Sequence, residues 1–168
     1  MSETAEQYLS RLSSYVEGKD PLSVLADTPG LIAREVEGAD NEKLTRRPAP
    51  DEWCVNEIVG HLLDDEIATA WRYRQMIEND GALLASFNQD EWARLGHYSE
   101  GPVGETLNLF RMIREWNLRM LRSLSPDEWN RTGVHAERGP TSVKELAGHM
   151  AGHDLNHLEQ IRRITRQT

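Results

Sequence analysis

A long stretch of helical periodicity restricts the fold of this chain more than any other feature of its sequence. From about Val55 to Asn79, apolar residues recur at spacings of three and four and cover more than half of a helical circumference. Such a helix is expected at the centre of a protein, with other helices packed around it. No segment shows the apolar–polar alternation of a half-buried strand, so the sequence predicts an all-α helical bundle.

Three further segments have the same periodicity and supply partners for the central helix. They are Thr4–Glu17, Val103–Leu124 and a segment from Ser142 to about Arg166, which opens with a capping box made by Ser142 and Glu145. Within the second of them, an apolar stripe is formed by Leu109, Ile113, Trp116 and Met120.

Pro and Gly residues gather between these segments and predict the connections. We expect a short turn of helix capped by Asp20-Pro21, and a separate helix after Pro29-Gly30. Loops are expected at Asn41–Asp51, at Gly81–Gly101 with one short helix (Gln89–Leu95), and at Gly133–Pro140. The prediction is one domain over residues 1–168, with residues 1–20 as an N-terminal helical extension and 21–168 as the bundle.

Charge and composition exclude several classes of protein. The chain has 19 Lys and Arg against 28 Asp and Glu, a net charge of −9, which disfavours nucleic acid and anionic membranes as partners. No apolar run approaches the ~18 residues of a membrane span, and the N-terminus does not resemble a signal peptide. One cysteine cannot form an intrachain disulfide. A cytoplasmic protein is therefore expected.

The histidines carry the chemical signal. His149, His153 and His157 lie four residues apart, so they project from one side of a helix. Two imidazoles at this spacing can chelate one metal ion. A third ligand from another helix would complete the set and leave positions open for water, as in a catalytic metal site.

The helical wheel selects two of these three histidines. The buried stripe of the C-terminal helix is defined by Val143, Leu146, Met150, Ile161 and Ile164. His157 falls inside this stripe, His153 lies at its edge, and His149 points about 90° away from its centre. We therefore favour His153 and His157 as the pair.

His61 is the histidine of the central helix, and two carboxylates share its face. Glu57 lies one turn before it and Asp65 one turn after it. Either carboxylate can orient His61, join the metal directly, or act as a general base. Asp154 and Gln160 are candidates for the same supporting role beside the other pair.

A non-functional interpretation accounts equally well for the spacing alone. A lone histidine on a helix is more often a hydrogen-bonded core or surface residue, and pairs four apart also arise by chance. His97 and His135 fall in predicted loops and are expected to be ordinary, as is Cys54 at the start of the central helix. The chain has no H-E-x-x-H, Glu-x-x-His, G-x-S-x-G, Walker A or G-x-G-x-x-G motif.

At these residues the chain resembles the DinB-like (DinB/YfiT) family of metal-binding four-helix bundles. The resemblance rests on PDEWCVNEIVGHLLDDE at 50–66 and on RTGVHAERGPTSVKELAGHMAGHDLNHLEQIRRI at 131–164. It implies one divalent metal, zinc or nickel, bound by His61, His153 and His157. It also implies a homodimer formed by helix packing. Cys54 replaces the commoner Ser or Thr at its position, and His149 is an extra histidine.

Two kinds of function follow from these observations. The first is a metal-dependent enzyme that either transfers a low-molecular-weight thiol, as some members of the family do, or hydrolyses a small substrate, with Asp65 or Glu57 as the base. The second is a non-catalytic module in which the metal ties two helices together. A helical dimerisation domain with incidental histidines ranks third.

Overall fold

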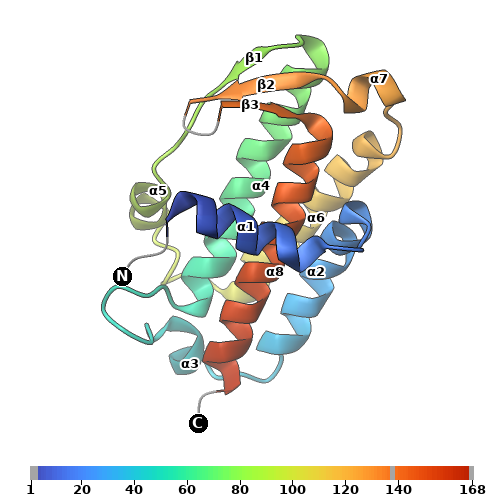
Figure 1. The fold of residues 1–168 in the computed structure, drawn as a ribbon. Coiled ribbons are helices and arrows are strands. Elements are labelled where there is room, and N and C mark those ends of the chain that lie inside the picture. Colours follow the sequence, from blue (N-terminus) through green and yellow to red (C-terminus); the bar gives the residue numbers. More distant parts are fainter. Residues whose placement is uncertain (1–3, 137–138, 167–168) are drawn as a thin grey trace.

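Four long helices form a bundle in the computed structural model, which describes residues 4–136 and 139–166 (Figure 1). They are α2 (Pro21–Val36), α4 (Val55–Glu78), α6 (Val103–Leu121) and α8 (Val143–Arg166). Both α4 and α2 contact α6 and α8. The predicted all-α four-helix bundle with an extra N-terminal helix is confirmed. No described helix is long and apolar enough to cross a membrane.

The N-terminal helix α1 (Ala5–Val16) lies across α8 on the outside of the bundle (Figure 1). The two helices meet at Gly152, where a Cβ atom would lie 2.4 Å from the backbone oxygen of Leu12. Only glycine permits this approach. The side chain of Arg11 adds a hydrogen bond to Asn156 on α8. These two contacts hold the N-terminal helix against α8 at Gly152, the residue before His153.

A small sheet closes one end of the bundle and corrects the expectation that the chain has no strands. Its order is β1-β2-β3, with β1 (Ala82–Leu84) parallel to β2 (Thr132–His135) and β2 antiparallel to β3 (Gly139–Ser142). Strands of three or four residues are too short to show alternation, and β3 has the sequence GPTS. The sheet places the side chain of His135 at the end of β2, beside Leu84 of β1.

A continuous α2 corrects the expected break at Pro29. Proline lacks an N–H and leaves the carbonyl four residues earlier without its helical donor. That carbonyl belongs to Leu25, and it accepts a hydrogen bond of 2.9 Å from Nη1 of Arg114 on α6 instead. The helix therefore passes through Pro29 with its free acceptor satisfied from outside.

The other short helices are α3 (Asn41–Thr45), α5 (Gln89–Leu95) and α7 (Pro126–Trp129). The prediction of a short helix at Gln89–Leu95 is confirmed. The expected loop at Asn41–Asp51 is wrong at its start, because Asp40 accepts a hydrogen bond from the backbone N–H of Lys43 and caps α3.

The apolar stripe predicted for α6 lies mostly on the outside. Leu109 and Trp116 are more than half exposed, and the buried side of α6 carries Phe110, Arg114 and Asn117 instead. Two of these residues are polar, so hydropathy alone selects the wrong side of the helix. They can be buried because they meet charged partners on the neighbouring helices.

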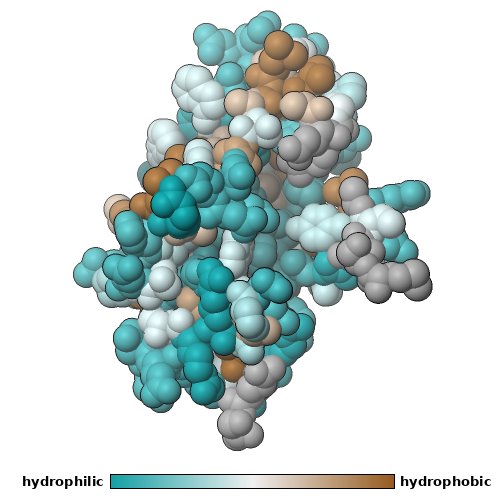
Figure 2. All heavy atoms as spheres, turned by 90° about the vertical axis from the view of Figure 1, so that its left-hand side faces the viewer, coloured by the Kyte–Doolittle hydropathy of each residue, from teal (hydrophilic) through white to brown (hydrophobic). Residues whose placement is uncertain are grey.

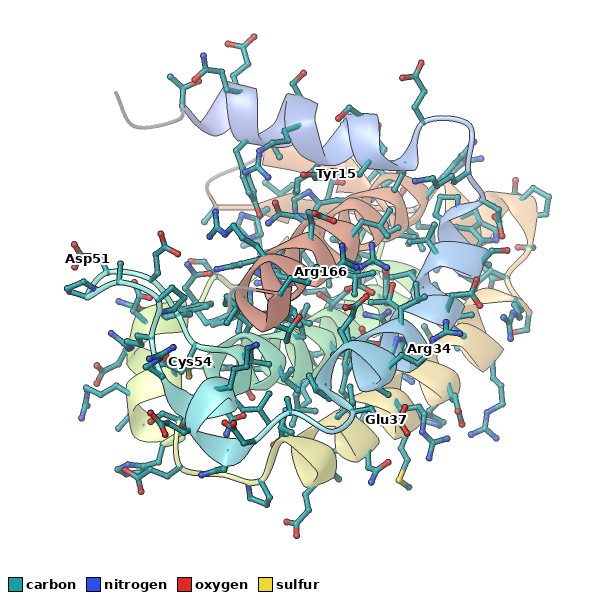
Figure 3. All side chains as sticks on the ribbon, turned by 90° about the horizontal axis from the view of Figure 1, so that it is seen from below. Tyr15, Arg34, Glu37, Asp51, Cys54 and Arg166 are labelled. Carbon is teal, nitrogen blue, oxygen red and sulfur yellow. The ribbon has the colours of Figure 1, made fainter. Side chains whose placement is uncertain are left out.

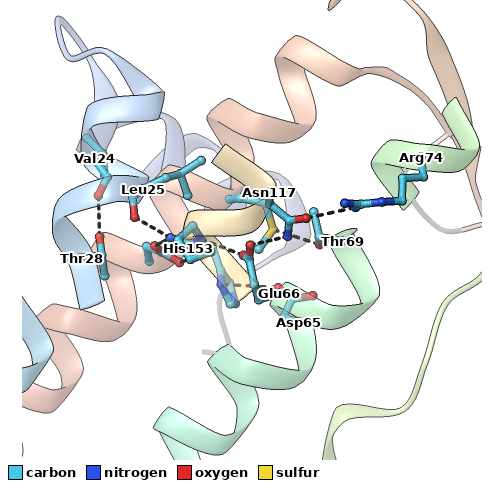
Figure 4. Close-up of polar contacts among 12 residues, drawn as sticks. Val24, Leu25, Thr28, Asp65, Glu66, Thr69, Arg74, Asn117 and His153 are labelled. Carbon is cyan, nitrogen blue, oxygen red and sulfur yellow. Dashed lines mark hydrogen bonds and ion pairs between the residues drawn. The ribbon is translucent and has the colours of Figure 1, made fainter. Parts of the chain in front are cut away.

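A layer of buried charges crosses the bundle, which we call the ion layer and define as Glu66, Arg114, Asn117 and Asp154 (Figure 4). Nε of Arg114 lies 2.8 Å from Glu66, and Nη1 lies 2.6 Å from Asp154. Asn117 donates a hydrogen bond of 2.6 Å to Glu66. Burial lowers the pKa of Arg114, but the two carboxylates outweigh it and raise that pKa above its usual value.

The ion layer separates two apolar clusters. One cluster lies toward the sheet and contains Leu25, Met76, Leu118, Leu121 and Met150 among others. The other lies toward the C-terminal end of α8 and contains Ile32, Ile58, Phe110, Leu158 and Ile161 among others. On α8, Asp154 of the layer lies between His153 and His157, and on α4 Glu66 follows His61 by five residues.

Candidate metal centre

His61, His153 and His157 come together in the interior, and all three are buried. Nε2 of His153 lies 3.1 Å from Nε2 of His61 and 3.1 Å from Nε2 of His157. One ligand atom from each ring lies within 4.8 Å of the other two. We call this group the histidine trio.

The spacing of the nitrogens fits a shared metal ion. Two ligand nitrogens on zinc are about 3.3 Å apart at a tetrahedral angle and about 2.9 Å apart at a right angle. The observed 3.1 Å lies between these values.

The protonation of the rings also fits a shared metal ion. Nδ1 of His157 lies 3.0 Å from Oε1 of Gln160, an acceptor, so Nδ1 carries the hydrogen and Nε2 carries a lone pair. Nδ1 of His153 lies 3.6 Å from Oδ2 of Asp65, which favours the same tautomer. Two lone pairs then face each other at 3.1 Å. A bound cation is the group that such an arrangement accommodates.

Burial favours the neutral form of His61 and His157, as metal ligation requires. Desolvation lowers the pKa of His61, although Asp65 partly opposes it. Desolvation, together with repulsion from His61, lowers the pKa of His157 to about 3. At neutral pH both rings therefore keep the lone pair that a metal ion needs.

Asp65 stands beside the trio and connects it to a buried arginine. Its Oδ2 faces Nδ1 of His153, and its Oδ1 lies 3.9 Å from Nη1 of Arg72. Arg72 is itself held by a hydrogen bond of 2.8 Å from Nη2 to the backbone oxygen of Ala85. Sequence reasoning missed Arg72, although it lies two helical turns after Asp65 on α4. Figure 4 shows Asp65 and His153 side by side.

Glu57 is engaged elsewhere. It pairs with Arg47 at 2.5 Å and accepts a hydrogen bond from the backbone N–H of Cys54, which completes the predicted capping frame of α4. Burial raises the pKa of Glu57, but these hydrogen bonds outweigh it and leave that pKa lowered.

Of the remaining candidate residues, one supports the trio and the others are engaged elsewhere. Gln160 supports His157, as expected for one of the two polar residues beside the pair. Asp154 belongs to the ion layer instead and binds Arg114. Cys54 is buried, and burial raises the pKa of its thiol to about 11. In Figure 3, Cys54 lies closer to the helical bundle than Asp51, which stands at the outer edge of the preceding loop.

Two histidines outside the trio lie close to it. The His149 ring stacks beside that of His153, with centroids 6.3 Å apart. His135 was expected to be an ordinary loop residue. It instead ends β2, is buried and lines the cavity described next. Trp53 covers His61 from the start of α4, with ring centroids 4.9 Å apart.

A cavity of about 400 Å³, here called the trio cavity, opens onto His61 and His153. The other side chains around it are Tyr8, Leu9, Asp65, Arg72, Ser86, Phe87, Gln89, His135, His149 and Met150. They come from α1, α4, α5, α8 and the segments beside the sheet. The volume falls in the range of small-molecule sites. The face seen in Figure 2 is mostly hydrophilic, with hydrophobic side chains gathered toward its upper end.

The fold and the trio define a class of helical bundle with a buried three-histidine centre, and comparison with known proteins gives the family. The model of the DinB superfamily matches residues 25–161. The chain belongs to this superfamily.

Individual relatives agree with this membership. A protein of Oceanobacillus iheyensis named "Putative metal-dependent hydrolase" is 27% identical over 140 residues, covering 83% of this chain and 81% of the relative. One of Halalkalibacterium halodurans with the same description is 22% identical over 129 residues, covering 77% and 75%.

Two solved structures share the fold. YfiT from Bacillus subtilis superimposes with a TM-score of 0.83 at 18% identity, covering 98% of this chain and 89% of YfiT. A mycothiol-dependent maleylpyruvate isomerase gives a TM-score of 0.68 at 13% identity, covering 84% of this chain and 59% of the isomerase.

Proposed function

We propose that this protein is a metal-dependent enzyme that hydrolyses a small molecule, with His61, His153 and His157 as the metal ligands. The observation that carries the proposal is the convergence of three buried histidine nitrogens beside the trio cavity, which His61 and His153 line. Three protein ligands and an adjoining space are the features of a catalytic metal site rather than a closed structural one. The names of the sequence relatives support hydrolysis.

Zinc and nickel are the metals we propose, because neutral imidazoles suit both. A divalent ion held by the trio would lower the pKa of a water or thiol at its open position. Within the chain, Gln160 and Asp65 fix the orientation of His157 and His153. Desolvation lowers the pKa of His61 and of His157 and so favours their neutral form.

Asp65 is the base we assign to the reaction. Its carboxylate lines the trio cavity, where it can take a proton from the attacking nucleophile. Arg72 on its other side favours the ionised carboxylate. Glu57 was an equal candidate from the sequence, but its bonds to Arg47 and Cys54 leave it a structural role.

Transfer of a low-molecular-weight thiol is the second candidate. The mycothiol-dependent isomerase among the structural neighbours favours it, since that protein uses a thiol. The same site serves both reactions, because Asp65 can accept a proton from a thiol as well as from water. A non-catalytic metal-stabilised module is the remaining alternative.

Elemental analysis tests the metal site. The protein is purified without a tag or metal column and incubated with zinc or nickel. We expect about one metal per chain, lost in His61→Ala and His157→Ala and kept in His149→Ala as the matched control. Equal loss from His149→Ala and His157→Ala would refute the choice of ligands.

Activity distinguishes the candidates that remain. Metal-loaded protein is assayed with ester and amide panels, and separately with small thiols and an electrophile. Turnover of either panel that disappears in His61→Ala identifies the reaction. A melting temperature that collapses on metal removal, with no turnover, supports the structural module.

We further propose one domain over residues 1–168 and a cytoplasmic homodimer. The surface that suits a dimer is the outer face of α4 and α6, where Ile67, Trp71, Leu109, Met112 and Trp116 are all exposed. Nη1 of Arg74 bonds Asn117, which places these two rows of side chains next to each other. Large apolar side chains exposed together on one face mark an interaction surface in many proteins.

A further inference from the structure

A second cavity of about 430 Å³ adjoins the trio cavity and is not used by the reaction proposed above. Both cavities are lined by Leu9, Arg72, His135 and His149, so these side chains form the boundary that the two spaces share. The second cavity continues along α8 as far as Glu145. From His153 to Glu145 is eight residues, or about 12 Å of helix.

The character of the lining changes along this path. Around the trio, half of the lining side chains are histidines, Asp65 and Arg72. Beyond Arg72, apolar side chains form much of the roof and floor: Leu9, Leu12 and Val16 from α1, Leu84 from β1, and Leu146 from α8. Leu9 is still 38% exposed although it lines both cavities.

The roof comes from outside the part of the chain that matches the family model. That match begins at residue 25, whereas α1 spans Ala5–Val16. Its contact with Gly152 and the bond from Arg11 to Asn156 hold α1 over the groove. The extension therefore adds a wall that the matched bundle lacks.

We propose that the second cavity is the binding subsite for the apolar tail of an elongated substrate whose polar reacting group lies at the histidine trio. The substrate class is thus amphipathic: a polar head that can approach a metal ion, followed by an aliphatic or aromatic tail. This inference rests on the proposed function and extends it to specificity. The N-terminal helix is the element that sets the length and shape of the accepted tail.

Gly148 gives a direct way to fill the subsite. It lines the second cavity, and a Cβ atom placed on it meets nothing within 4 Å. Gly148→Leu should therefore extend a side chain into the subsite without displacing the backbone. Gly30 on α2 is exposed and equally open, so Gly30→Leu is the matched control. Ser13→Phe fills the same subsite from the α1 side if Gly148→Leu does not fold.

The probes are alkyl hydroxamates, which chelate an accessible metal ion through a constant head. Their affinity for zinc-loaded protein is measured by calorimetry from acetohydroxamate to decanohydroxamate. Each buried methylene is expected to improve Kd by about fourfold. Gly148→Leu should bind acetohydroxamate but lose this gain for the longer chains, whereas Gly30→Leu should retain it.

Two failures have different meanings. If acetohydroxamate binds but chain length has no effect, or if Gly148→Leu and wild type share one slope, the subsite is overturned and the metal site stands. If acetohydroxamate does not bind to zinc-loaded protein, the proposed function is overturned, and this inference with it. Zinc content and circular dichroism of each variant establish that it is folded and loaded.

Discussion

Removing the guanidinium of Arg114 tests the ion layer that supports the metal centre. Arg114→Met keeps an unbranched side chain and most of its volume, but it shortens the side chain and deletes its charge and its donors. The wild-type group makes four polar contacts of 2.6–3.2 Å: one to Glu66, two to Asp154 and one to the backbone oxygen of Leu25. Arg114 is only 2% exposed, and both carboxylates are equally buried.

The expected cost follows from what remains. Breaking a buried ion pair by removing one partner costs about 3–5 kcal/mol, because the other charge stays buried without compensation. Here two carboxylates are left, so we expect the upper part of this range. A domain is stable by about 5–15 kcal/mol, so the variant should fold but be strongly destabilised.

The stability lost in Arg114→Met is expected to depend on pH in a defined direction. Desolvation raises the pKa of Asp154 even beside Arg114, and removal of Arg114 raises it further. The folded variant then binds more protons than the unfolded chain, so its stability increases as pH falls. The deficit relative to wild type should therefore be smaller at pH 5 than at pH 8.

Urea unfolding measures both effects. Arg111→Met on the same helix is the matched control, because Arg111 is exposed and its pair with Glu115 contributes at most about 1 kcal/mol. Equal costs for the two variants, or a deficit that grows at low pH, would refute this account. The triple variant Arg114→Met, Glu66→Gln, Asp154→Asn should recover much of the lost stability, since it leaves no unpaired charge.

Four further predictions concern the site and its surroundings. Asp65→Asn should weaken zinc affinity by about 10–100-fold in a chelator competition, and unchanged affinity would remove Asp65 from the site. Glu57→Gln should cost about 1 kcal/mol in urea unfolding through the weakened cap of α4 but leave zinc content intact, whereas lost zinc would return Glu57 to the site. Because the folded pKa of His157 is about 3 and lies below the unfolded value of 6.5, the metal-free protein should lose stability as pH falls through 6.5, by up to about 1.4 kcal/mol per unit for this group; a flat urea profile from pH 7.5 to 5 contradicts this. Trp116→Asp should convert a homodimer to monomer in light scattering, and a dimer that survives places the interface elsewhere.

Three of the four long helices of the bundle, α4, α6 and α8, could be predicted from the sequence because each carries enough turns for its periodicity to appear. The structure places α4 at Val55–Glu78 and α8 at Val143–Arg166, within a residue or two of the predicted limits. The same reasoning favoured His153 and His157 on α8, whereas their grouping with His61 was what the family resemblance implied; the structure places the three side chains together.

The other features depend on partners distant in the chain. Pro29 marks a helix end by local rules, but Arg114, 85 residues later, supplies the donor that lets α2 continue. The buried side of α6 combines four apolar residues with Arg114 and Asn117, so a purely apolar stripe does not identify it. Arg114 can be buried there because Glu66 and Asp154 face it. The three strands are shorter than the pattern that identifies a strand.

The ion layer also restricts how the helices can shift against one another. In a core made only of leucines and valines, a helix can slide by one turn and exchange one apolar contact for another of similar strength. A slide of α8 past α6 would instead place Asp154 among apolar side chains and deprive Arg114 of this carboxylate partner. His153 is the neighbour of Asp154, so the ion pair that fixes the position of α8 along the bundle axis also fixes the position of its histidines relative to His61. Transplanting the three histidines into another bundle would therefore reproduce the centre only if the charged layer were moved with them.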